Sequence, residues 1–281
     1  MNKAAIEYYG KTWTKPIERK IEDRNTIKCS CGESFTWKPE DDEPLSDFFK
    51  PSRCPKCEAE FQKMQEERDR QREIERAAEE AAAIARLRES TLARLDRMTP
   101  ARYLATDIKH SSFNLKLWQQ VKTWRPTPEI PWLGLIGESG GCKTRFAYLL
   151  LRDIVLESLP TSTAMKGARG ISFETACAYE IADAIRRQHS RDDTKGAATS
   201  RDFLDRLSNT DLLLLDDLGK AKNTQAVVAE LFAIIDFRHA ENLPTIWTAN
   251  SPPEVIAAGM SEDIAGPFAG RLIECSNIVT V

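Results

Sequence analysis

Residues 137–144 decide the fold that this sequence predicts, and they read Gly137-Glu138-Ser139-Gly140-Gly141-Cys142-Lys143-Thr144. They follow the apolar run Trp132–Ile136, which predicts a strand, and they run into Arg145–Leu159, which has helical periodicity. The pattern G-x-x-x-x-G-K-[ST] in this context is typical of a phosphate-binding loop, because its glycines let backbone N–H groups surround a β-phosphate. Lys143 would reach the β and γ oxygens, and the Thr144 hydroxyl would bind Mg²⁺. The stretch therefore predicts a site for ATP and Mg²⁺.

One position of this loop departs from the pattern, because Cys142 stands where the last glycine belongs. A Cβ at that position crowds the tightest part of the phosphate cradle, although a cysteine side chain is small. A degenerate loop that no longer binds nucleotide is therefore the alternative interpretation. We expect nucleotide binding, since further elements of an ATP site follow along the chain.

The next element of that site is an apolar strand, Leu212–Leu215, which ends in Asp216 and Asp217. At the carboxyl edge of a parallel sheet, side chains that follow a strand face the ligand crevice. We expect Asp216 to hold Mg²⁺, directly or through water, and Asp217 to orient or deprotonate the attacking water. Many ATPases have glutamate at the second place, so the shorter Asp217 predicts slow hydrolysis. A pair of aspartates that only caps a turn is the alternative.

A further predicted strand, Thr245–Thr248, brings Thr248 and Asn250 to the same edge, where an amide can position water against a γ-phosphate. Apolar runs alternate with helical patterns through the whole of 99–281, which predicts βαβ units and an α/β domain with a parallel sheet. The other predicted elements are strands at Gly170–Glu174 and Ile278–Val281 and helices at Cys177–Gln188 and Val227–Ala240.

Three segments resemble the DnaC/DnaI helicase-loader and IstB branch of AAA+ ATPases. They are DLLLLDDLGK at 211–220, AELFAIIDFRHAENLPTIWTANSPPEVI at 229–256 and AGRLIE at 269–274. The resemblance covers about residues 100–281. It implies an AAA+ P-loop domain with a five-stranded parallel sheet and no C-terminal lid. It also implies ATP-dependent assembly along single-stranded DNA and delivery of a partner machine.

The resemblance also implies roles for individual residues. It makes Lys143 and Thr144 the P-loop residues, Asp216 and Asp217 the acidic pair, and Asn250 the first sensor. Arg271 resembles the arginine finger that reaches the γ-phosphate of a neighbouring subunit, which implies a homo-oligomer in the ATP-bound state. Arg238 is a weaker second candidate. The alternative interpretation of either arginine is a surface ion pair.

Four cysteines near the N-terminus form two close pairs, Cys29-x-Cys31 and Cys54-x-x-Cys57. Two such knuckles can complete a tetrahedral Cys₄ site, so we expect Zn²⁺ in a small ribbon over residues 1–57. Free thiols or an iron–sulfur cluster are the alternatives. Four sulfur ligands leave no open coordination position, so catalysis is not expected here. Because the module has few apolar residues, we expect it to fold only with its metal. A partner-binding role is implied by the resemblance to DnaI-like loaders.

A linker helix is predicted between this module and the ATPase domain, because residues 58–98 contain neither glycine nor proline and are dense in strong helix formers. A dimerising coiled coil is the alternative to a solvated helix. Two groups of basic residues are candidates for contacts with the phosphates of single-stranded DNA. One group lies near the end of Ala184–Arg191, and the other consists of Lys220 and Lys222. A solvated charged face is the alternative there.

The net charge of −3 provides no global positive field, so any DNA contact has to be local. No run approaches the ~18 apolar residues of a membrane span, and no signal peptide is evident, so no membrane contact and a cytoplasmic location are expected. The leading hypothesis is a bacterial or phage-type loader of a replicative helicase, with slow, DNA-stimulated ATP hydrolysis. DnaI-like loaders also carry a zinc module that binds the helicase.

Two other functions stay open at the level of sequence. An IstB-like ATPase helper of DNA transposition shares the ATPase domain. A nucleotide-binding adaptor with little hydrolysis is the third hypothesis, and Cys142 and Asp217 are the residues that favour it.

Overall fold

The computed structural model describes residues 26–36, 51–106, 108–109, 113–161, 170–188, 194–219 and 224–281. The chain divides into two units inside helix α1 (Pro55–Met98), one ending at Ala78 and the other running from Glu79 to Val281. No helix in the described part is long and apolar enough to cross a bilayer. The division into a module over 1–57, a linker over 58–98 and an ATPase domain over 99–281 stays a prediction.

The first unit contains a small antiparallel hairpin of β1 (Thr26–Lys28) and β2 (Ser34–Thr36). The turn between the strands is closed by the N–H of Cys29, which donates to the carbonyl of Glu33 at 2.8 Å. Gly32 holds a φ of +94°, a conformation that a glycine adopts without steric strain. The hairpin turn therefore carries the first cysteine pair, and the second pair lies at the start of α1.

The second unit is built on a five-stranded parallel sheet. Its strand order is β4 (Phe173–Cys177), β5 (Leu212–Leu218), β6 (Thr245–Ala249), β3 (Trp132–Ile136) and β7 (Ser276–Thr280). The strand before the phosphate loop, β3, and the strand with the acidic pair, β5, are separated by β6. The carboxyl ends of all three strands meet at one edge, as the sequence predicted. The predicted α/β fold with a five-stranded parallel sheet is confirmed.

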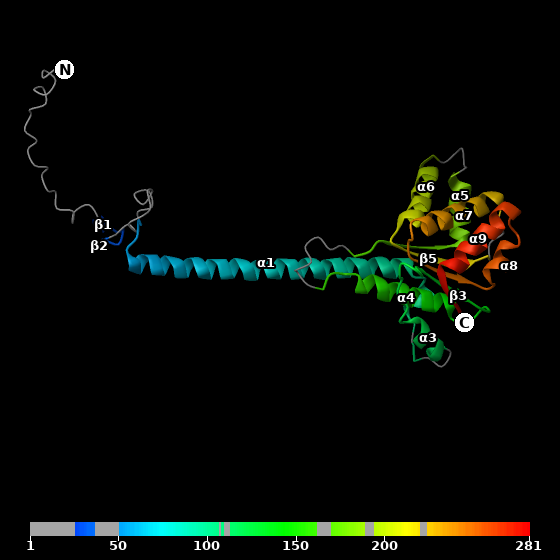
Figure 1. Ribbon diagram of the computed structural model, residues 1–281, viewed down its shortest axis with the longest axis horizontal. Coiled ribbons are helices and arrows are strands. Elements are labelled where there is room, and N and C mark those ends of the chain that lie inside the picture. Colours follow the sequence, from blue (N-terminus) through cyan, green and yellow to red (C-terminus); the bar gives the residue numbers. More distant parts are fainter. Residues whose placement is uncertain are drawn as a thin grey trace, which may run out of the picture. The chain divides into compact units, whose positions relative to one another are not determined.

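Helices cover both faces of this sheet (Figure 1). One face is covered by α4 (Lys143–Glu157), and the other by α5 (Ala178–Gln188), α6 (Thr194–Asn209), α7 (Gln225–Ala240) and α9 (Glu262–Glu274). The four leucines Leu212–Leu215 show why, because they alternate between the two hydrophobic clusters and none is more than 1% exposed. A strand that is buried on both faces reads as an unbroken apolar run.

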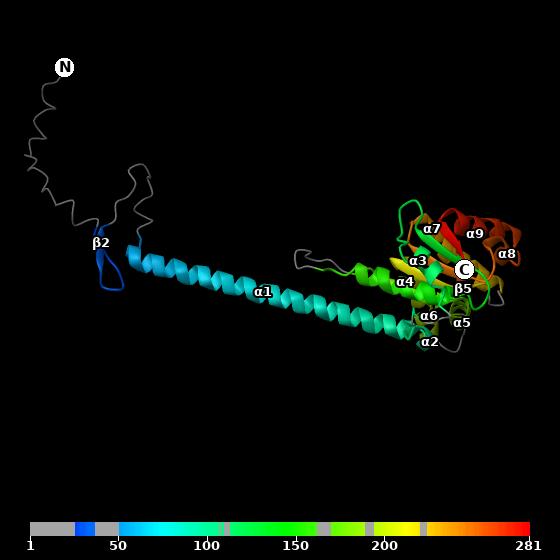
Figure 2. The ribbon, with the colours of Figure 1, turned by 90° about the horizontal axis from the view of Figure 1, so that it is seen from below.

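Three short helices complete the second unit. They are α2 (Ala101–Leu104), α3 (Leu115–Val121) and α8 (Pro253–Ala257). Helix α3 packs on α4 (Figure 2), where the rings of Trp118 and Phe146 lie 5.7 Å apart. Phe113 meets Phe146 edge-on at 5.2 Å, so an aromatic cluster ties this segment to the helix that follows the phosphate loop.

Two predicted strands are displaced in the structure. The strand predicted at Ile278–Val281 is β7, which spans Ser276–Thr280. The other is β4. The sequence predicts Gly170–Glu174, whereas β4 spans Phe173–Cys177, since its pairing with β5 places Phe173 beside Leu212. Ser172 lies just before the strand and binds Asp211 through both its N–H and its hydroxyl, each at 2.7 Å. The helix predicted from Cys177 accordingly begins at Ala178.

Arg238 is not the surface residue that either interpretation of the sequence requires. Its side chain is 0% exposed and donates to the hydroxyl of Thr245 and to four backbone carbonyls. The carbonyls belong to Leu207, Ser208, Thr210 and Pro244. Burial lowers the pKa of this guanidinium to about 9. Arg238 therefore fastens the end of α6 to β6 and is inaccessible to a neighbouring subunit.

Candidate functional site

The phosphate loop leads from β3 into α4, and Cys142 is the N-cap residue of that helix. Its φ of +66° and ψ of 9° are left-handed, a region in which a Cβ is strained and a glycine is not. This geometry explains why the pattern has glycine at this position. The loop retains its shape with cysteine, at a local energetic cost.

Lys143 is buried beneath the loop, with 5% of its surface exposed. Its ammonium group donates to the carbonyls of Gly137 and Glu138 at 2.8 and 2.7 Å. The charge is therefore held by the loop itself, where the oxygens of a bound phosphate could replace the carbonyls as acceptors.

Three segments meet at the carboxylate of Asp216. Its Oδ1 accepts from the hydroxyl of Thr144 at 2.8 Å and from the hydroxyl of Thr248 at 2.7 Å. Burial raises the pKa of Asp216, while these two hydrogen bonds oppose the shift. A hydroxyl and a carboxylate in contact beneath a phosphate loop are the oxygen donors that Mg²⁺ prefers, so the residues fit this ion.

A cleft of about 330 Å³ opens above this cluster. Eight of the residues predicted for the site line it, namely Ser139, Gly140, Gly141, Cys142, Lys143, Thr144, Asp217 and Asn250. Asp217 has a left-handed φ of +58°, and its N–H donates to the hydroxyl of Thr248 at 2.9 Å. Of the other predicted residues, Asp216 binds Thr144, and Gly137 and Glu138 hold Lys143 from within the loop.

Arg271 does not line this cleft. It lies on α9, where its Nε donates to Asp236 at 2.5 Å and its guanidinium lies 5.5 Å from the centre of the Phe232 ring. The ion pair that was the alternative interpretation is thus present within the chain. The finger role concerns a neighbouring subunit and stays a prediction.

Three residues that were not predicted for the site also line the cleft: Arg102, Tyr103 and Arg145. Arg145 directly follows the loop, so its position could have been inferred from the motif. Arg102 and Tyr103 lie on α2, which no sequence pattern placed near the loop. The rings of Tyr103 and Tyr148 stack, with centroids 5.8 Å apart and an angle of 18° between their planes.

The four cysteines of the first unit converge, with all four sulfurs within 4.8 Å of one another. The sulfurs of Cys31 and Cys54 are 3.7 Å apart. A tetrahedral site with Zn–S bonds of about 2.3 Å places its sulfurs roughly 3.8 Å apart, so the cluster is compatible with Zn²⁺.

The thiols of this cluster cannot all ionise easily without a cation. The backbone N–H groups of Cys31 and Cys54 lower the pKa of Cys29 to about 6. The thiols of Cys31, Cys54 and Cys29 in turn raise the pKa of Cys57. Adjacent thiolates repel one another, and a divalent cation would remove that repulsion.

The candidate DNA contacts are only partly covered by the described residues. Arg186 and Arg187 are well exposed at the end of α5, and both pair with Asp183, at 3.5 and 2.7 Å. Arg191, Lys220 and Lys222 lie outside the described residues. Contact with single-stranded DNA therefore stays a prediction.

No protein-family model matches the chain, and no curated protein matches it. Among solved structures, the chain is similar to the crystal structure of the DnaC helicase loader, with 22% identity, a TM-score of 0.43 and coverage of 65% of this chain and 99% of that one. It is also similar to DnaI, with 19% identity, a TM-score of 0.44 and coverage of 64% and 93%.

A third similar structure is AMPPCP-bound DnaA from Aquifex aeolicus, with 18% identity, a TM-score of 0.43 and coverage of 65% of this chain. The chain spans 51% of the length of that DnaA structure.

Replacing Cys54 should remove the metal from the first unit. We expect purified wild-type chain to carry an equimolar amount of zinc by elemental analysis, and Cys54→Ser to lose most of it, because a three-thiolate site is incomplete. Cys275→Ser, which alters a half-buried cysteine outside the cluster, should keep the zinc. Equal zinc in wild type and Cys54→Ser, or iron in place of zinc, would contradict the assignment.

Replacing Cys142 with glycine should relieve strain in the phosphate loop. We expect Cys142→Gly to raise the free energy of unfolding by about 1 kcal/mol, because glycine adopts a left-handed φ without a steric penalty. Cys142→Ala keeps the Cβ and should give no such gain. Chemical denaturation of the three proteins measures the difference, and equal stability of the glycine and alanine variants would show that the cysteine is not strained.

Proposed function

We propose that this chain is an ATPase that loads a replicative DNA helicase onto single-stranded DNA. The binding and hydrolysis of ATP are supported by the contact between Thr144 and Asp216 beneath the cleft of the phosphate loop. The resemblance of segments 211–220, 229–256 and 269–274 to helicase loaders supports the loader part. The cysteine module that precedes α1 in the sequence supports it as well, because DnaI-like loaders carry such a module.

In this proposal each cleft residue has a separate task during ATP hydrolysis. Lys143 would exchange the loop carbonyls for β and γ oxygens, and Thr144 and Asp216 are the residues that would hold Mg²⁺. Mg²⁺, when bound, neutralises charge on the transferring phosphoryl group. Asp217 accepts a proton from the attacking water or orients it, and Asn250 fixes the position of that water.

Slow turnover follows from the two left-handed residues of the site. Cys142 and Asp217 both hold positive φ angles, and the Cβ of Cys142 crowds the phosphate cradle where the pattern has glycine. The carboxylate of Asp217 is also one methylene shorter than that of a glutamate. ATP then acts mainly as a switch for assembly. The same features support the alternative function, an adaptor that holds nucleotide with little hydrolysis.

Arg271 completes the site of a neighbouring subunit in this proposal. Its side chain is 28% exposed and its partner Asp236 is 46% exposed, and such solvated pairs contribute roughly 0–1 kcal/mol. The pair is therefore weak enough to be exchanged for a γ-phosphate when subunits assemble with ATP. A finger of this kind stabilises the charge of the transferring phosphoryl group only in an oligomer.

The first unit is proposed to bind the helicase, and α1 to tether it. Among the residues of α1, all of which are described, only Leu95 is buried. Apart from its packed C-terminal end, α1 exposes most of its side chains, which suits a solvated linker helix.

A loading assay with the full chain tests this function. The replicative helicase of the host is incubated with circular single-stranded DNA and the chain, and DNA-bound helicase is measured. Wild-type chain with ATP should increase loading. Lys143→Ala should lose both ATP binding and loading, because the buried ammonium is the main phosphate ligand. Arg97→Ala serves as the control, since Arg97 is exposed and does not line the cleft.

The same proteins distinguish the alternatives through ATP turnover. Arg271→Ala should bind ATP normally and lose DNA-stimulated hydrolysis, because the finger acts on the neighbouring site. ATP binding without helicase loading, but with stimulation of a transposase, would favour the transposition helper. Undetectable hydrolysis with DNA and helicase both present would favour the adaptor, and intact ATP binding by Lys143→Ala would remove the P-loop assignment.

A further inference from the structure

Two residues of the nucleotide cleft come from a segment that no motif includes. Arg102 and Tyr103 lie on α2, and both line the cleft together with Lys143, Thr144 and Asp217. Only Thr99 and Pro100 separate α2 from the end of α1. The wall of the cleft is thus continuous along the chain with the predicted linker helix.

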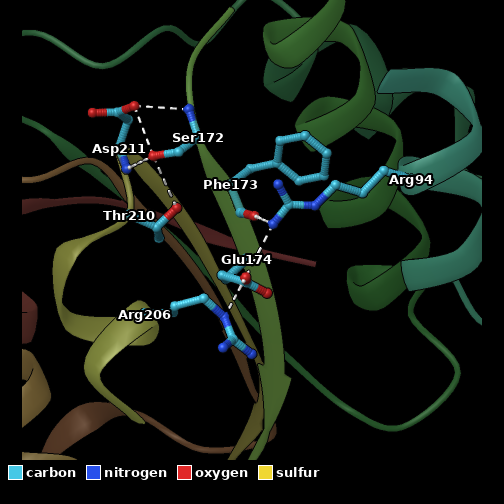
Figure 3. Close-up of polar contacts among 7 residues, drawn as sticks. All are labelled: Arg94, Ser172, Phe173, Glu174, Arg206, Thr210 and Asp211. Carbon is cyan, nitrogen blue, oxygen red and sulfur yellow. Dashed lines mark hydrogen bonds and ion pairs between the residues drawn. The ribbon is translucent and has the colours of Figure 1, made fainter. Parts of the chain in front are cut away.

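The end of α1 is fastened to the edge of the sheet by a buried glutamate (Figure 3). Glu174 on β4 is 8% exposed, and its Oε1 accepts from Arg94 on α1 and from Arg206 on α6, both at 3.0 Å. Arg94 also donates to the carbonyl of Phe173 at 2.8 Å and lies over its ring at 4.6 Å. A carboxylate held by two guanidinium groups, with a third contact to the backbone, fixes both the position and the direction of the helix end.

The neighbouring residues of α1 hold the same end against α4. Leu95 is 1% exposed and belongs to the cluster beneath α4, and Asp96 accepts from Arg152 of α4 at 2.6 Å. The hydroxyl of Thr99 donates to the carbonyl of Leu95 at 2.7 Å, which closes the last turn. Helix α2 therefore starts from a fixed point.

Tyr103 then places α2 on the metal side of the cleft. It stacks on Tyr148, and the pKa of Tyr148 is raised by burial and by the nearby charge of Asp216. Tyr103 itself lines the cleft together with Thr144, Asp217 and Asn250. This is the side on which the terminal phosphate and its metal ion would lie.

The fixed end of α1 and the stacked Tyr103 place the guanidinium group of Arg102 at the cleft. Its side chain is exposed, and within the part of the chain that the structure describes no hydrogen bond or ion pair engages its guanidinium group. We propose that Arg102 binds the terminal phosphate of the nucleotide in the same subunit, so that the anchored end of α1 responds to whether ATP or ADP is bound. This proposal rests on the proposed function, because it requires the cleft to bind ATP.

A guanidinium group is suited to this task because its planar donors match phosphate oxygens in a two-pronged contact. Hydrolysis removes the oxygens that Arg102 binds, and α2 then loses a contact that Lys143 and Thr144 retain. Only Thr99 and Pro100 separate α2 from α1. A change in the position of α2 would therefore be passed directly to α1, the helix that leads to the first unit. Arg102 is therefore a nucleotide-sensing residue in addition to the trans-acting Arg271.

The test compares ATP and ADP binding by the full chain, measured by calorimetry with Mg²⁺. We expect Arg102→Ala to weaken ATP binding by about tenfold or more, the effect of losing a charge-assisted contact, and to leave ADP binding unchanged. Arg102→Lys should recover only part of the ATP affinity, because a lysine lacks the two-pronged geometry. Arg97→Ala makes the same change of charge outside the cleft and should bind both nucleotides as wild type does.

Hydrogen exchange over residues 94–104 tests the coupling to α1. Exchange should be slower with ATP than with ADP in wild type, and this difference should vanish in Arg102→Ala. Wild-type ATP affinity in Arg102→Ala, or equal loss of ATP and ADP binding, would overturn the inference. If Lys143→Ala abolishes ATP binding while Arg102→Ala binds ATP as tightly as wild type does, the inference fails and the ATP site stands. If wild type binds no ATP, both fail.

Discussion

The carboxylate of Asp216 is the point on which the arrangement of this domain depends. One oxygen accepts from a hydroxyl of the helix that follows the phosphate loop and from a hydroxyl of the strand between the two halves of the site. This contact requires β6 to lie between β3 and β5, and it requires all three strands to end at one edge. The strand order of the sheet and the position of the phosphate loop are thus both required by this one contact. Burial disfavours the ionised form of Asp216, and a bound divalent cation would offset that cost.

Packing on the two faces of the sheet supplies the stability that offsets the energetic cost of this site. The leucines of β5 belong alternately to the two hydrophobic clusters. At the opposite end of the domain, Arg238 donates hydrogen bonds to four backbone carbonyls. Two of the non-glycine residues with positive φ, Cys142 and Asp217, are at the carboxyl edge, and Asn242 is in the turn before β6. Strained residues at the ligand side of a well-packed sheet are common at functional sites.

Much of this domain could be predicted from the sequence, because the informative signals are local. The strand Trp132–Ile136 has the predicted bounds, and eight predicted residues line the cleft. Helix α6 was not predicted, since Gly196 and several Ser and Thr residues weaken its helical pattern, and it is stabilised by burial of Leu204 and Leu207. The link from Arg94 to Glu174 joins residues 80 positions apart. A contact between residues so far apart leaves no periodic pattern in the sequence. The burial of Arg238 could not be predicted from such a pattern either.

The most direct measurement is the Mg²⁺ dependence of ATP affinity, determined by calorimetry for wild type and for Asp216→Asn. Wild type should bind ATP more tightly with Mg²⁺ than with EDTA. Asp216→Asn should lose most of this difference, because the carboxylate that faces Thr144 is gone. A wild-type affinity that does not depend on Mg²⁺, or a variant with the full dependence, would contradict the assignment of this cluster as the metal end of a nucleotide site.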